Sequence, residues 1–193
     1  MSVEVFVHPQ GLCESSQVGK GTRIWAFAHV MKNAVVGEGC NICGGAFIES
    51  GAILGNGVTV KNNVLVWDKV TVEDQVFLGP NAVFTNDMNP RAAFKKDPDE
   101  FLTTKVRVGS SIGANATIVC GVEIGKSSFV GAGSVVIHDV PDHALVVGNP
   151  ARQIGWMCEC GKKLGGMELD EQSISCSCGR HYELVDGKLT KQA

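Results

Sequence analysis

Four cysteines near the end of the chain have the residue type and spacing of metal ligands. They form two short pairs, Cys158-Glu-Cys160 and Cys176-Ser-Cys178, each followed by glycine and with fifteen residues between the pairs. Four thiolates suit the tetrahedral coordination of Zn²⁺, and a hairpin would bring the pairs together. Most zinc ribbons use Cys-x-x-Cys pairs, so three alternatives stay open: His181 replaces one thiolate, the tail is disordered or oxidised, or it has a redox role. We expect a structural zinc site, remote from any reaction centre.

A second group of polar residues lies in the middle of the chain. Asn86 and Asp87 are adjacent, and Arg91 follows them in a polar segment that contains two prolines, residues 86–104. The planar guanidinium of Arg91 suits phosphate oxygens. Loops that leave a rigid scaffold commonly carry binding or catalysis. This cluster therefore favours a functional loop over the alternative, a tolerated surface insertion.

The elements that must position these groups are predicted by a repeat with a period of six. An aliphatic residue recurs every six positions from Leu12 to Leu78, Phe84 continues the series, and a second register runs from Val106 to Val136. A period of six fits neither a helix nor a plain alternating strand. Each hexapeptide instead predicts one short strand and one turn, so that successive coils stack at the ~4.8 Å parallel spacing. The fold class is therefore an all-β solenoid.

The repeat is interrupted once and then ends before the cysteines. Between Phe84 and Val106 the interval is 22 residues, which is not a multiple of six. A solenoid can extrude such an insertion from one corner without breaking its core. We expect one parallel β-helix over residues 1–155 with the loop 86–104 extruded, followed by a small cysteine-rich tail over residues 156–193.

Polar and aromatic residues follow one predicted edge of this solenoid. Glu49, Trp67 and Thr85 are eighteen residues apart, so they stack in successive coils if a coil has three hexapeptides. The loop leaves from the same edge. A solvated edge is the plain interpretation. The alternative is that a ligand lies along it, with Trp67 offering its ring face and Asp68 accepting from a hydroxyl or imide group.

The pattern [aliphatic]-Gly-x-x-[small]-x resembles that of the hexapeptide-repeat acyltransferase superfamily. Over roughly residues 10–165 the chain looks like bacterial N-acetyltransferases that act on nucleotide-linked 3-amino sugars, in the segments FTNDMNPR, IGANATIVCGVEIG, VGAGSVV and DVPDHALVVGNPARQIGWMCECG. The resemblance implies a left-handed β-helix and a homotrimer with active sites between subunits. It implies acetyl-CoA as co-substrate and a UDP- or dTDP-linked 3-amino sugar as acceptor, for O-antigen or lipopolysaccharide sugars. The ending GWMCECG is typical of the UDP-uronate group, whereas VWDKV and FTND are typical of the dTDP-deoxysugar group.

The same resemblance assigns roles to the loop. Asn86 would place the sugar amine for attack on the thioester, and the departing CoA sulfur would collect the proton, so that no protein base is needed. Asp87 would accept from the amine as an auxiliary, or else serve only as a turn residue before Asn89-Pro90. Arg91 would bind the pyrophosphate, and Glu49, Trp67 and Asp68 would line the sugar-nucleotide.

Small side chains in the second register are expected on the coenzyme side. They would let a pantetheine arm lie against the backbone, although tight coils need the same residues for packing. Lys126 and Arg152 would reach the CoA phosphates, and Asn149 belongs to a turn after the last coil. The predicted coenzyme-binding residues are Gly113, Ala114, Asn115, Ala116, Lys126, Ala132, Asn149 and Arg152.

Composition excludes several other classes. The net charge of −3 gives no field that attracts nucleic acid. No apolar run reaches the ~18 residues of a membrane span, and the N-terminus lacks the pattern of a signal peptide, so we expect a cytoplasmic protein. Two alternatives to N-acetyl transfer remain: an O-acetyltransferase of a small hydroxylated acceptor, and a non-catalytic β-helix scaffold. The former needs a histidine base, and none of the five histidines lies in the loop.

Overall fold

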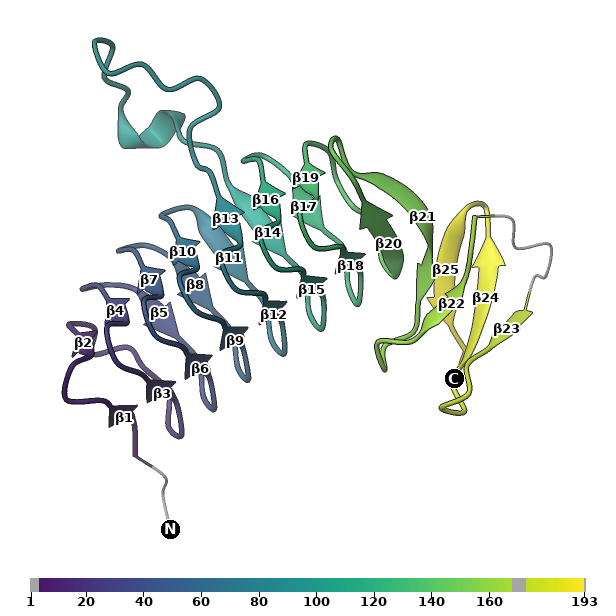
Figure 1. The fold of residues 1–193 in the computed structure, drawn as a ribbon, viewed down its shortest axis with the longest axis horizontal. Helices are drawn as coiled ribbons and strands as arrows, with labels where there is room; N and C mark the ends of the chain where they lie inside the picture. The colour runs from purple at the N-terminus through teal and green to yellow at the C-terminus, as the bar shows by residue number, and fades with distance from the viewer. Residues whose placement is uncertain (1–3, 168–172, 193) are drawn as a thin grey trace.

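The computed structural model describes residues 4–167 and 173–192 (Figure 1). Residues 1–3, 168–172 and 193, which belong to the predicted β-helix and tail, lie outside the described residues. Within the described part the one helical element is a single 3-10 turn, η1 (Pro98–Glu100), and everything else is strand or turn. No described helix has the length and apolar character that crossing a bilayer requires.

Short parallel strands stack into the three faces of a left-handed β-helix, as the repeat and the resemblance predict. Sheet A consists, in spatial order, of β1 (Phe6–Val7), β3 (Arg23–Ile24), β6 (Asn41–Ile42), β9 (Thr59–Val60), β12 (Phe77–Leu78), β15 (Ser111–Ile112), β18 (Phe129–Val130), β20 (Ala144–Val147), β21 (Arg152–Met157) and β22 (Lys163–Gly165). Sheet B consists of β2 (Leu12–Cys13), β4 (His29–Val30), β7 (Phe47–Ile48), β10 (Leu65–Val66), β13 (Val83–Phe84), β16 (Thr117–Ile118) and β19 (Val135–Val136). Sheet C consists of β5 (Val35–Val36), β8 (Ile53–Leu54), β11 (Val70–Val72), β14 (Thr104–Val106) and β17 (Glu123–Ile124).

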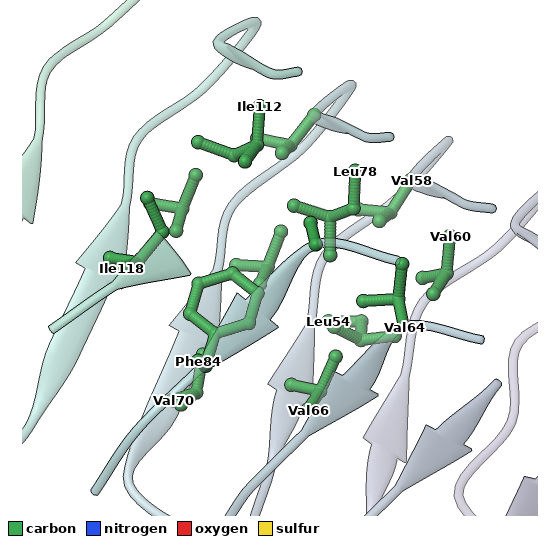
Figure 2. Close-up of a cluster of buried hydrophobic side chains, with 14 of the residues drawn as sticks. Leu54, Val58, Val60, Val64, Val66, Val70, Leu78, Phe84, Ile112 and Ile118 are labelled. Atoms are coloured by element: carbon green, nitrogen blue, oxygen red, sulfur yellow. The ribbon is translucent and has the colours of Figure 1, made fainter. Parts of the chain in front are cut away.

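The core is the column of inward-facing residues that the six-residue period marks from Val18 onward. The first member of the predicted series is wrong: Leu12 lies opposite His29 on the outward face, and Cys13 takes the inward place because it pairs with Val30. Ile24, Ile48 and Leu54 are wholly or almost wholly buried, and Phe84 continues the column where the repeat is about to break. Figure 2 shows the middle of this column, where Leu54, Leu78 and Phe84 lie together with valines such as Val58 and Val64 in the space between the strands. Because every coil contributes to this one column, the β-helix has a single continuous core.

Glycine is required where one coil turns directly over the next. A Cβ on Gly37 would lie 2.5 Å from both the carbonyl carbon and the carbonyl oxygen of Gly55. Two residues further on, the turns need a positive φ instead, which Gly39 adopts at 65° and Asn63 adopts at 60°. The first position of each turn therefore requires glycine because the next coil lies too close for a Cβ. The third position requires a residue that tolerates a positive φ.

The extruded loop leaves the β-helix between β13 and β14, within a residue of the predicted limits, and projects from its side (Figure 1). Its two ends are tied together and to the coil below. The N–H of Leu102 donates to the carbonyl of Asn86 (3.0 Å), and that of Thr104 donates to the carbonyl of Lys69 (3.0 Å). Val72 then pairs with Val106, so the ladder resumes in register.

The end of the chain reverses direction. β21 runs antiparallel to β20, and β22 runs antiparallel to β21. The expected boundary at residues 155 and 156 thus falls inside β21. In the described residues beyond it, β23 (Ser173–Ser175), β24 (His181–Val185) and β25 (Lys188–Lys191) form a separate antiparallel sheet.

The coil packing predicts opposite outcomes for two neighbouring glycines. Gly37→Ala places a methyl group against the next coil and is expected to lower the free energy of unfolding by about 2 kcal/mol or more. Gly39→Asn, where a Cβ meets nothing within 4 Å and asparagine tolerates the conformation, should change it by less than about 0.5 kcal/mol. Thermal and denaturant unfolding of both variants measure this, and equal losses would contradict the steric explanation.

Candidate functional site

The turns from sheet B to sheet C, which we call the BC corner, carry the predicted sugar-side residues. Phe47 pairs with Leu65, and Ile48 with Val66, so Glu49 and Trp67 stack in successive coils, as the eighteen-residue spacing predicts. The carboxylate of Glu49 accepts from the backbone N–H of Asp68 (2.7 Å). Glu49 therefore fixes the backbone that presents Asp68 at this corner.

Trp67 is half-buried, and part of its side chain contacts other residues of the β-helix. Its indole N–H donates to the carbonyl of Phe84 (2.8 Å), and its ring lies 5.8 Å from that of Phe47. It also packs against the core. These contacts fix the orientation of the ring and leave only its remaining exposed surface to a ligand, so the stacking role stays a prediction.

The root of the loop is held by backbone and hydroxyl contacts. Asn86 is half-buried, and its carbonyl receives the Leu102 N–H described above. The hydroxyl oxygen of Thr85 accepts from the backbone N–H of Cys120 in the next coil (2.9 Å). The backbone on both sides of the Asn86 side chain is therefore fixed where the loop departs.

Asp87 and Lys96 form an ion pair that closes the loop on itself. The same carboxylate oxygen of Asp87 accepts from the N–H of Asn89 (2.9 Å), which is the turn-capping role foreseen as the alternative. The Lys96 ammonium holds the pKa of Asp87 below its usual value. Sequence reasoning missed Lys96, because a loop without a period gives no indication of which of its lysines folds back.

The loop encloses a hollow of about 420 Å³ that Asp87, Arg91, Phe94 and Lys96 help to line. Arg91 is exposed, and its guanidinium donates only to the carbonyl of Pro90 (3.1 Å) among the hydrogen bonds of the described residues. The structure thus brings Asp87 and Arg91 to one cavity and leaves most donors of Arg91 available to an anion.

The turns from sheet A to sheet B, the AB corner, carry most of the predicted coenzyme residues. A Cβ on Gly113 would lie 2.5 Å from the backbone nitrogen of Ala132, so Gly113 and Ala132 are in adjacent coils at this corner. Ala114 is half-buried, and Asn115 follows with φ 57°. The side chains at this corner are small apart from that of Asn115, which is the property on which the coenzyme prediction depends.

The turn containing Asn149 lies on top of this corner. The N–H of Gly148 donates to the hydroxyl oxygen of Ser134 (3.1 Å), and the N–H of Val135 donates to the carbonyl of Gly148 (2.9 Å). The N–H of Ala151 then donates to the carbonyl of Val135 (2.8 Å). The turn is therefore bound to β19 and presents Asn149, which is exposed, above the AB corner.

Three predicted coenzyme residues do not present a side chain at the surface of the AB corner. Ala116 is wholly buried in the core and has no surface to offer to a ligand of this chain. Lys126 is exposed at the third corner, where its backbone N–H is bound by Asp142 (2.6 Å). Arg152 lines a hollow of about 400 Å³ with His138 and Gln153. Ala116 therefore closes the AB turn with its side chain inward, and Lys126 and Arg152 lie away from this corner.

The two halves of the candidate site are at opposite ends of the strands of sheet B: the AB corner precedes each strand and the BC corner follows it. One strand with its flanks, four residues at ~3.3 Å each, separates the corners by roughly 13 Å. His29 lies on the outward face between them, where its ring nitrogen is 2.9 Å from the carboxylate of Glu14 and its ring is 5.4 Å from that of Phe47. A histidine–carboxylate pair was not foreseen, because residues 14 and 29 are in different coils and neither interrupts the repeat.

The predicted metal ligands converge. The sulfur atoms of Cys158, Cys160, Cys176 and Cys178 all lie within 4.8 Å of one another. His181, the alternative ligand, has its ring nitrogen 2.8 Å from the hydroxyl of Ser175. Of the alternatives, the geometry therefore favours four thiolates over three thiolates and an imidazole.

Known proteins resemble the chain in sequence. Residues 15–50 match the family described as bacterial transferase hexapeptide (six repeats), and residues 109–137 match the hexapeptide repeat of succinyl-transferase. The dTDP-3-amino-3,6-dideoxy-alpha-D-galactopyranose 3-N-acetyltransferase of Aneurinibacillus thermoaerophilus is 50% identical over 182 residues, which cover 94% of this chain and 92% of the relative. The bifunctional protein GlmU of Thermosynechococcus vestitus is 34% identical over 68% of this chain and 27% of its own length.

Solved structures resemble the chain in fold. A variant of the GDP-perosamine N-acetyltransferase of Caulobacter crescentus, in complex with CoA and GDP-perosamine, has a TM-score of 0.57 at 23% identity; the match covers 80% of this chain and 58% of that one. The acetyltransferase domain of PglB from Neisseria gonorrhoeae has a TM-score of 0.55 at 22% identity, covering 80% of this chain and 59% of that one. At these identities the likeness concerns the fold alone.

Because Asp87 and Lys96 form an ion pair across the loop, we expect this pair to keep the loop ordered. Lys96→Met removes the ammonium that holds Asp87, and chymotryptic cleavage after Phe94 or Phe101 is expected to become several-fold faster. Lys95→Met, a neighbour that is exposed and loses the same charge, serves as the control and should behave as the unmodified chain. Equal cleavage of both variants would mean that the pair does not order the loop.

Proposed function

The chain belongs to the hexapeptide-repeat acyltransferases, and on that premise we propose that it transfers an acetyl group from acetyl-CoA to the 3-amino group of a nucleotide-linked amino sugar. One observation carries the proposal: half of the residues are identical, over nearly the whole of both chains, to those of an enzyme named for this reaction. The same similarity supports a dTDP-linked 3-amino-3,6-dideoxyhexose, rather than a UDP-linked uronate, as the acceptor. Acetyl-CoA is then a co-substrate, not a resident cofactor.

The reaction needs a neutral amine in contact with the thioester carbonyl, and donors for the oxyanion that forms there. Asn86 is the proposed positioning group for the amine, because it is half-buried where the loop departs and its backbone carbonyl is held by the N–H of Leu102. Backbone N–H groups of the AB corner are the proposed donors. The amine proton leaves with the CoA thiolate, so no protein base is required.

The other loop and corner residues bind the sugar-nucleotide in this proposal. Arg91, with its unused donors, receives the pyrophosphate, and Asp68 and Trp67 face the sugar or base. Glu49 acts indirectly by holding the backbone at Asp68. Asp87 is ionised and already paired with Lys96, which supports a structural role in the loop over direct contact with the amine.

A complete site requires a second copy of the chain, which we propose is supplied by a homotrimer. The sugar side and the coenzyme side are at opposite ends of the strands of sheet B. They therefore meet only if the BC corner and loop of one subunit reach the AB corner of the next. The surface supports this: Phe94 at the loop is 76% exposed, and the outward face of sheet B carries Leu12, Phe47, Leu65 and Val83. A cyclic arrangement repeats one such contact three times.

In the cell, the proposed substrates are both cytoplasmic metabolites, and we place the enzyme there. Its product would be an N-acetylated nucleotide sugar for a surface polysaccharide such as an O-antigen. The pair of His29 and Glu14 favours a second candidate, O-acetyl transfer, because a histidine held by a carboxylate can activate a hydroxyl.

The acceptor distinguishes these candidates. Release of free CoA from acetyl-CoA is expected with dTDP-3-amino-3,6-dideoxygalactose, and at least tenfold less with UDP-2-acetamido-3-amino-2,3-dideoxyglucuronate. The matched control is dTDP-6-deoxygalactose, which carries a hydroxyl in place of the reacting amine and should give no release. Turnover of that hydroxyl sugar would favour O-acetyl transfer, and release with the uronate alone would reassign the acceptor.

A site shared between subunits predicts complementation between inactive variants. Asn86→Ala impairs the sugar side, and Ala132→Trp fills the exposed coenzyme side. Each alone is expected to lose most activity while eluting as an oligomer of unchanged size. Trimers that mix the two chains randomly should regain about a quarter of the wild-type rate, because a quarter of the interfaces then join two intact halves. Activity no higher than that of the parents would place both halves in one chain.

A further inference from the structure

The four cysteines of the tail are spaced as a tetrahedral metal site is. The sulfur atoms of Cys158 and Cys178 are 3.5 Å apart, and those of Cys160 and Cys176 are 3.6 Å apart. With Zn–S bonds of about 2.3 Å, the sulfurs of a tetrahedral Zn²⁺ site lie ~3.8 Å apart. A disulfide would bring two of them to about 2.05 Å. We propose that these four thiolates bind one structural Zn²⁺, independently of the acetyl transfer proposed above.

The two Cys-x-Cys-Gly segments form the same turn. In the first, the backbone N–H of Cys158 donates to the carbonyl of Lys162 (2.9 Å), and that of Gly161 donates to the carbonyl of Cys158 (2.8 Å). In the second, the backbone N–H of Cys176 donates to the carbonyl of Arg180 (2.8 Å), and that of Gly179 donates to the carbonyl of Cys176 (2.9 Å). The glycines have φ of 83° and 89°, which explains why glycine follows each pair. Two copies of one turn, facing each other, present two sulfurs each.

Hydrogen-bond donors point at the sulfurs. The hydroxyl oxygen of Tyr182 accepts from the backbone N–H of Glu159 (3.0 Å) and lies 3.1 Å from the sulfur of Cys158, within reach for its own proton to be donated there. The guanidinium of Arg180 donates to the sulfur of Cys178 (3.4 Å). Donors at these two positions would stabilise thiolates, which are the form that binds a metal. Arg180 also offsets part of the net −2 charge of a zinc tetrathiolate.

The four cysteines lie between the end of the β-helix and the separate C-terminal sheet, where a bound metal would join the two. Cys158 and Cys160 follow β21, which pairs with the last full strand of the β-helix, whereas Cys176 and Cys178 precede β24 of the separate sheet. The apolar cluster between them is small: Trp156 of β21 packs with Ile174, Tyr182 and Leu189 of the separate sheet. So few apolar side chains rarely stabilise a unit alone, and metals commonly supply the difference. The zinc would hold the C-terminal sheet to the end of the β-helix.

The test is the metal content of the full-length protein. After expression with added zinc and gel filtration, elemental analysis is expected to find about one zinc per chain. Replacement by Co²⁺ should produce the visible and charge-transfer absorption of a tetrahedral cobalt tetrathiolate. Less than about a tenth of an equivalent, with no cobalt spectrum, would overturn the proposal. An intact mass lower by four hydrogens would assign two disulfides instead.

Variants separate ligation from folding. Cys178→Ser is expected to reduce retained zinc at least tenfold, and Cys178→His, which keeps a ligand atom, should restore much of it. Cys13→Ala removes a thiol from the N-terminal coils, far from the cluster, and should keep the full equivalent. Chelation of the wild-type protein should expose the tail to proteolysis while the β-helix stays intact. Unchanged zinc in Cys178→Ser would exclude this thiol as a ligand.

Discussion

The hydrogen-bonded stacking of one coil on the next places every functional group in this molecule. The N–H of His29 donates to Ala46, and that of Phe47 donates to Val64, so equivalent residues of neighbouring coils face each other in register. A slip of one residue would turn the inward column outward, so the register is fixed by the core. Residues eighteen apart in the sequence are thereby held one strand spacing apart on the surface. The BC and AB corners are consequences of this ladder, and the loop is the place between two coils where the chain leaves it.

Sequence reasoning succeeded where this ladder dictates the outcome. The period of six predicted the strands, the core column and the stacking of Glu49 on Trp67, because each follows from steric fit within a coil. It also carried a signal against one coenzyme assignment: Ala116 occupies the same small inward position as Ala28 and Ala46, which are buried. Ordering the hexapeptides by face would likewise have placed Lys126 at a different corner from Gly113.

What the sequence did not predict depends on contacts outside the repeat. The pairing of Lys96 with Asp87 depends on how the loop folds back, and the bond from Trp67 to Phe84 depends on a rotamer choice at the corner. The four cysteines are an intermediate case. Their clustering was expected, yet the departure from Cys-x-x-Cys spacing left alternatives open until the two matching turns could be compared. The convergence of the four sulfurs, rather than the spacing, is the observation that favours a metal site.

The reversal of the chain at β21 also has a bearing on how the molecule stays discrete. A parallel solenoid ends in unpaired strand edges that could template indefinite growth from one molecule to the next. Here the terminal strand of sheet A is covered by antiparallel β21, that of sheet B by the turn containing Asn149, and that of sheet C by the bridge from Ile124 to Val140. β21 is antiparallel and the turn containing Asn149 is not a strand, so the bridge at Val140 is the one parallel pairing among these covering segments. Residues 140–157 therefore close the end of the β-helix to the addition of a further parallel coil.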